Sequence, residues 1–63
     1  MVQVFVWLVY SPDDNGYYAE VTNKAGQELH STNVFMDKVL LKRHLLNVAN
    51  KENWNLNYMK GGV

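Results

Sequence analysis

The chain has 63 residues, six basic and six acidic side chains, two histidines and no cysteine. This length predicts a single domain over residues 1–63 with a small core, because a chain of about 60 residues buries only about 60% of the surface that its unfolded form exposes. The formal net charge is zero, so the chain lacks the excess of basic residues with which nucleic-acid-binding proteins neutralise phosphates. The absence of cysteine excludes disulfides and thiolate metal sites.

The first predicted element is a strand over residues 2–10, in which β-branched and aromatic residues dominate. This apolar run is far shorter than the ~20 residues that a membrane span needs. It also lacks the basic region and the small-residue cleavage site of a secretory signal. We therefore expect a cytoplasmic protein with no membrane attachment.

Two turns are predicted around the second strand. Residues 11–16, Ser-Pro-Asp-Asp-Asn-Gly, combine proline, aspartate and an Asn-Gly pair, all of which favour turns. The strand itself is expected over residues 17–23. The following Lys-Ala-Gly, residues 24–26, fits a three-residue hairpin loop with glycine in the left-handed position.

The pairing that this loop imposes places Val21 opposite Leu29 on one face and Glu20 opposite His30 on the other. A carboxylate beside an imidazole can act as an acid–base pair or as two metal ligands. A cross-strand charge pair on a solvated face is the commoner arrangement. Since no activated nucleophile, glycine-rich phosphate loop or HExxH motif accompanies the pair, we predict no catalytic site, no metal and no cofactor.

A helix is predicted from Val34 to about Asn50, with Thr32 or Asn33 as its N-cap. At 100° per residue, its apolar residues form one stripe, which consists of Val34, Leu41, Leu45, Val48 and Ala49, widened by Val39 and Leu46. The opposite side is polar and consists of Asp37, Arg43, His44, Asn47 and Lys51, interrupted by Met36 and Leu40.

The last predicted strand covers residues 54–58, where apolar and polar residues alternate. Residues 60–63, Lys-Gly-Gly-Val, are typical of a loose tail. The expected fold is therefore α+β, with a three-stranded antiparallel meander, one helix on one face, and a C-terminal strand, in the order βββαβ.

The first strand is apolar on both faces, which is typical of a strand buried on both sides. One face carries Val2, Val4, Val6 and Leu8, and the other carries Phe5, Trp7 and Val9. Because one helix covers only one face, we assign the aliphatic face to the helix and leave the aromatic face open; the reverse assignment would expose the valines. An irregular strand, or a C-terminal segment folded across the open face, is the alternative. Exposed contiguous apolar patches usually mark interaction surfaces.

The segment Pro12-Asp13-Asp14-Asn15-Gly16-Tyr17-Tyr18-Ala19-Glu20-Val21 resembles the first hairpin of HicB-like antitoxins, small partial RNase H-like domains with a βββαβ order. The resemblance is limited to this hairpin and to the element order. It implies a protein without enzymatic activity that binds and blocks a small toxin, often as an oligomer. The family usually continues into a Pro-Gly segment where this chain has residues 22–26, and many members carry a DNA-binding segment after the domain.

The expected function is that of a protein-binding module that inhibits or sequesters another protein, either as an antitoxin or as a phage-encoded inhibitor of a host protein, alone or as a homodimer. The predicted contact residues are Phe5, Trp7, Val9 and Tyr18 on the open sheet face, extended by Met36 and Leu40 on the helix. The alternative is a single-stranded nucleic acid stacked on the aromatic face. Glu20 and Glu28, expected on that face, would repel phosphates.

Overall fold

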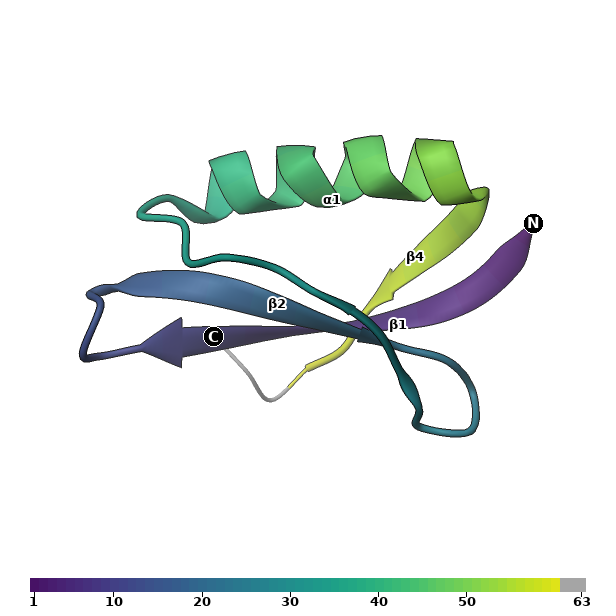
Figure 1. Ribbon diagram of the computed structural model, residues 1–63, viewed down its shortest axis with the longest axis horizontal. Coiled ribbons are helices and arrows are strands. Elements are labelled where there is room, and N and C mark those ends of the chain that lie inside the picture. The colour runs from purple at the N-terminus through teal and green to yellow at the C-terminus, as the bar shows by residue number, and fades with distance from the viewer. Residues whose placement is uncertain (61–63) are drawn as a thin grey trace.

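The computed structural model describes residues 1–60, in which one helix lies across one face of a four-stranded sheet (Figure 1). The elements follow in the predicted order as β1 (Val2–Ser11), β2 (Gly16–Thr22), β3 (Glu28–Ser31), α1 (Lys38–Glu52) and β4 (Trp54–Tyr58). The prediction of a small α+β fold with the order βββαβ is confirmed.

The sheet is mixed, with the strand order β3-β2-β1-β4. The first three strands form the predicted antiparallel meander, but β4 pairs with β1 in the parallel direction. This follows from the connection, because α1 carries the chain back over the sheet and β4 then runs in the same direction as β3 and β1. β4 therefore extends one edge of the sheet and does not cross its open face.

Side chains alternate along β1, and its aliphatic face lies under the helix. Val6 pairs with Val21 and Leu8 pairs with Ala19 on this face. The buried hydrophobic residues of the described chain come from β1, β2 and α1 and are Val4, Val6, Leu8, Ala19, Val21, Leu41, Leu45 and Ala49. The assignment of the aliphatic face to the helix is confirmed, although Val2, at the start of the strand, is exposed.

The second hairpin contains the predicted loop but not the predicted register. Gly26 adopts a φ of 86°, and the Asn23 and Gln27 backbones are hydrogen-bonded across the loop at 3.0 Å. A bulge then shifts the pairing between Thr22 and Val21, so that Val21 faces His30 and not Leu29. The extra residue is Leu29, and because side chains alternate with a period of two, His30 moves to the helix side of the sheet.

The helix starts later than predicted, because the residues before it extend the sheet. Phe35 and Tyr17 exchange two backbone hydrogen bonds of 2.7 Å, and the Thr32 hydroxyl accepts a hydrogen bond from the Ala19 N–H at 2.9 Å. Thr32 is therefore not the N-cap. That position is held by Asp37, whose Oδ1 accepts a hydrogen bond from the Val39 N–H at 2.8 Å.

Part of the predicted helix stripe faces the core and part does not. Leu41, Leu45 and Ala49 are buried, as predicted, but Val34 lies before the helix. Val39 and Leu46 are 62% and 56% exposed, because they lie on the side of the helix above β4, beyond the buried stripe.

Among residues 1–60, no helix is long and apolar enough to cross a membrane. The predicted tail falls on Lys60 and on residues 61–63, the latter lying outside the described residues.

Candidate protein-binding surfaces

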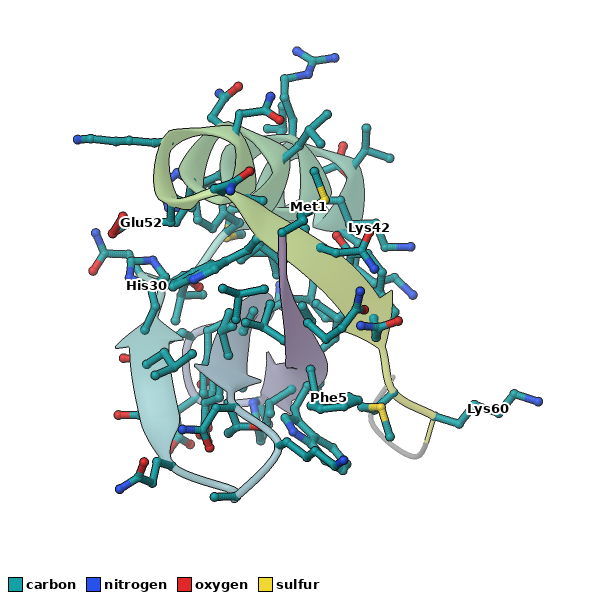
Figure 2. All side chains as sticks on the ribbon, turned by 90° about the vertical axis from the view of Figure 1, so that its right-hand side faces the viewer. Met1, Phe5, His30, Lys42, Glu52 and Lys60 are labelled. Carbon is teal, nitrogen blue, oxygen red and sulfur yellow. The ribbon has the colours of Figure 1, made fainter. Side chains whose placement is uncertain are left out.

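Phe5, Trp7, Val9 and Tyr18 share the sheet face that is turned away from α1, and we call these four residues the open face. The register places Val9 directly opposite Tyr18 and Trp7 opposite Glu20. Figure 2 shows Phe5 below the sheet while the helix lies above it. The strand register thus brings these four predicted residues together on one face. No helix or strand of the described chain covers this face.

Trp7 is the most exposed side chain of the open face, and a hydrogen bond holds its indole ring. Trp7 is 41% exposed, whereas Phe5, Val9 and Tyr18 are half-buried. The Trp7 indole N–H donates a hydrogen bond to Thr22 Oγ1 at 3.2 Å. A side chain fixed in this way loses little conformational entropy when a partner covers it.

A network of amide side chains borders the open face on the side of β4. Gln3 Oε1 accepts hydrogen bonds from Asn55 Nδ2 at 2.6 Å and from Asn57 Nδ2 at 2.9 Å. Asn57 Nδ2 also donates to the Val4 carbonyl at 3.0 Å. These contacts join β4 to β1 and give the apolar patch a neutral polar border.

Both charged side chains that the strand register places on this side of the sheet are acidic. Glu20 lies opposite Trp7, and Glu28 lies opposite Thr22, which itself faces Phe5. The open face is therefore an apolar surface with a negative border.

Met36 and Leu40 are not part of this surface. Met36 lies on the segment before α1 and Leu40 lies on α1, which packs against the other face of the sheet. Both side chains are exposed. The structure does not bring these two residues together with Trp7, and any contact through them would be a separate one.

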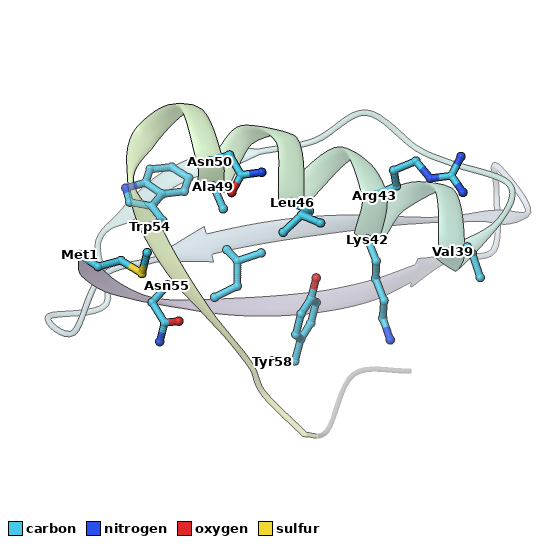
Figure 3. A pocket seen from close by; sticks show the side chains of 11 residues that line it. Met1, Val39, Lys42, Arg43, Leu46, Ala49, Asn50, Trp54, Asn55 and Tyr58 are labelled. Atoms are coloured by element: carbon cyan, nitrogen blue, oxygen red, sulfur yellow. The ribbon is translucent and has the colours of Figure 1, made fainter.

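A groove that the sequence did not reveal lies between α1 and β4 (Figure 3). It has a volume of about 600 Å³, and the figure shows Leu46 of the helix and Tyr58 of the strand pointing toward one another. The apolar residues that line it are Met1, Val39, Leu46, Ala49, Trp54, Leu56 and Tyr58. The available signal is the width of the predicted helix stripe, since Val39 and Leu46 lie at its edge.

Lys42 and Tyr58 meet at one end of the groove. The Lys42 ammonium lies 5.3 Å from the centre of the Tyr58 ring, a cation–π geometry. Partial burial in the groove raises the pKa of the Tyr58 hydroxyl above its usual value, because desolvation disfavours the phenolate.

The raised pKa of Tyr58 predicts a loss of stability in alkali. The folded protein binds the phenolic proton more tightly than the unfolded chain, so stability is retained below about pH 10 and falls as pH rises through the folded-state pKa. Urea unfolding between pH 8 and pH 11 should show a smaller decline for Tyr58→Phe than for the wild type. The other tyrosines are common to both proteins, so equal declines would contradict this prediction.

The predicted Glu20–His30 pair does not exist, because the bulge places His30 on the helix side of the sheet. The His30 ring lies 6.1 Å from the His44 ring and 6.5 Å from the Trp54 ring, and its buried Nε2 has no hydrogen-bond partner within the described part of the chain. His44, predicted on the polar side of the helix, is half-buried with its ring 5.3 Å from that of Phe35. Residues 1–60 contain no cluster of three or more histidine or acidic side chains that could hold a metal ion.

In comparisons with protein families, curated proteins and solved structures, the chain has no match.

Proposed function

We propose that this protein works by binding and blocking another protein through the open face. The observation that carries the proposal is the position of Trp7, which lies among Phe5, Val9 and Tyr18 in the middle of a sheet face that no described helix or strand covers. Tryptophan and tyrosine, together with arginine, are enriched at the energetic centre of protein interfaces. The resemblance of the first hairpin to HicB-like antitoxins supports the same kind of role.

The chemistry of the open face favours one kind of partner. Apolar contact at the centre and carboxylates of Glu20 and Glu28 at the border are complementary to an apolar protein surface flanked by lysine or arginine. The bases of a single-stranded nucleic acid could stack on the aromatic side chains. The same carboxylates, however, would repel its phosphates. A basic protein is therefore the better fit.

Trp7→Lys tests the proposal without disturbing the core, because the new ammonium group faces Glu20, its cross-strand neighbour. Replacement of a central interface tryptophan costs about 2 kcal/mol or more, which is about a 30-fold rise in Kd. A protein captured by the wild type would be purified and its Kd for both forms measured by calorimetry. Leu40→Lys is the matched control, since it places the same charge on the exposed side of α1.

The proposal predicts that Trp7→Lys loses the purified partner while Leu40→Lys retains it. Equal affinity of wild type and Trp7→Lys for that partner would contradict it. A labelled single-stranded oligonucleotide that binds the wild type at low salt, and fails to bind Trp7→Lys, would instead favour the nucleic-acid alternative.

A further inference from the structure

The two outer strands of the sheet differ in how far they are protected against pairing with another chain. β3 has four residues, a bulge interrupts its pairing, and it begins with the charged Glu28. Short length, irregularity and charge are devices that protect an edge strand. β4 has five residues, no charge and no proline, and it pairs regularly with β1 from Trp54 to Tyr58. The β4 edge is therefore the one open to a further strand.

The hydrogen bonds between β4 and β1 show which backbone groups this edge presents. The Val2 N–H donates to the Asn53 carbonyl at 3.1 Å, and the Met59 N–H donates to the Val6 carbonyl at 2.9 Å. In parallel pairing, alternate residues of a strand bond to the same neighbour, so the N–H and C=O groups of the intervening residues point away from β1. These outward residues are Trp54, Leu56 and Tyr58.

The three residues with outward backbone groups all line the groove with their side chains. A strand added to this edge would thus find donors and acceptors that no group of residues 1–60 engages, beside an apolar surface that includes Leu46 of the helix. Backbone bonds supply affinity in such strand addition, and the flanking side chains supply specificity. This edge is separate from the open face, and pairing along it is independent of the proposed function.

We propose that the added strand is β4 of a second copy of this chain, paired antiparallel around a twofold axis at Leu56. In this register Leu56 faces Leu56 of the second copy, and Trp54 faces its Tyr58. Each copy donates three N–H groups and accepts three, so every outward group finds a partner. The four strands of each copy then form one continuous sheet.

Three properties of the edge favour a second copy over a foreign strand. The outward positions are apolar at both ends and at the centre, so the strand is complementary to itself after a twofold rotation. The cross-strand pair of Trp54 and Tyr58 is aromatic, a favourable combination. The intervening residues are asparagines, so β4 itself brings no charge to the new strand pairing.

Tyr58→Pro tests the proposal, because proline removes an outward N–H that β1 does not use and its ring obstructs the incoming strand. Tyr58→Ala is the matched control, since it removes the same side chain but keeps the N–H. Analytical ultracentrifugation over a range of concentrations should show a wild-type dimer, a weakened dimer for Tyr58→Ala, and a dissociation constant raised at least 100-fold for Tyr58→Pro. Circular dichroism of the dilute proteins checks that each variant is folded.

Hydrogen exchange tests the register directly and does not depend on a variant. The amides of Trp54, Leu56 and Tyr58 should become more protected as the protein concentration rises, whereas the amide of Asn57 should not, because it already bonds to β1. Trp7→Lys should dimerise like the wild type, which separates this interface from the open face.

Three outcomes would overturn the proposal. They are a wild type that stays monomeric at millimolar concentration, a Tyr58→Pro protein that dimerises as tightly as Tyr58→Ala, and a dimer that is lost in Trp7→Lys. A monomeric wild type that instead binds an apolar peptide along β4 would assign the edge to a foreign strand.

Discussion

Replacing Leu45 with alanine is expected to remove about half of the stability of the protein. Leu45 is fully buried at the centre of α1, where it packs on the aliphatic face of the sheet. Truncation of a buried leucine costs about 2–5 kcal/mol, because a cavity remains where the side chain was. A domain of this size has a total stability of roughly 3–9 kcal/mol, at about 0.05–0.15 kcal/mol per residue. Urea unfolding followed by circular dichroism measures the loss.

Leu46→Ala is the matched control for this prediction. It is the next residue of the helix and carries the same side chain, but it is 56% exposed at the groove. Its replacement should change the free energy of unfolding by less than about 1 kcal/mol when measured at a concentration where the protein is monomeric. Similar losses for Leu45→Ala and Leu46→Ala would mean that the helix does not pack on the sheet through the face described.

Replacing Gly16 with alanine is expected to destabilise the protein by about 3 kcal/mol, the upper end of the usual cost of overpacking. A Cβ at this position would lie 2.5 Å from Val34 Cγ1 and 2.7 Å from the Phe35 carbonyl oxygen. The Val34 side chain can move aside, but the Phe35 backbone cannot, because its two hydrogen bonds to Tyr17 hold it beside β2. Thermal and urea unfolding of the variant measure the effect.

Gly26→Ala separates this steric effect from the conformational freedom of glycine. Gly26 has a φ of 86° but open space around it, so alanine there meets only the cost of the left-handed conformation, about 1–2 kcal/mol. Gly16→Ala should therefore be the more damaging of the two substitutions. A larger loss for Gly26→Ala would show that the segment before the helix yields easily and does not constrain Gly16.

The two glycines also illustrate what local sequence predicts. The Lys-Ala-Gly loop predicts a left-handed residue at Gly26, and the structure confirms it. The Asn-Gly pair of the first turn predicts a positive φ as well, and Asn15 carries it with a φ of 50°. The reason for glycine at position 16 is different, since it is the approach of residues 34 and 35, which are far away in the sequence.

The sequence predicts that Phe5, Trp7 and Val9 share one face of the sheet, but it left open which face the helix covers, and it did not predict the groove. The alternation of Phe5, Trp7 and Val9 depends only on the period of a strand, and one helix leaves one face of a sheet uncovered. The groove depends on where the helix axis lies above the sheet. Because α1 leaves β4 only partly covered, Val39 and Leu46 line a groove and are not part of the core.

By itself the sequence determined the element order, the turns, the buried aliphatic face and the aromatic face opposite it, because local propensity and side-chain periodicity act over a few residues. The tertiary structure alone decided the bulge at Leu29, the N-cap of α1 at Asp37 and the parallel placement of β4 beside β1. Each of these depends on hydrogen bonds or packing between segments far apart in the chain. Thr32 shows the difference, since its hydroxyl can cap a helix as well as extend a sheet, and only the nearby Ala19 N–H decides between them.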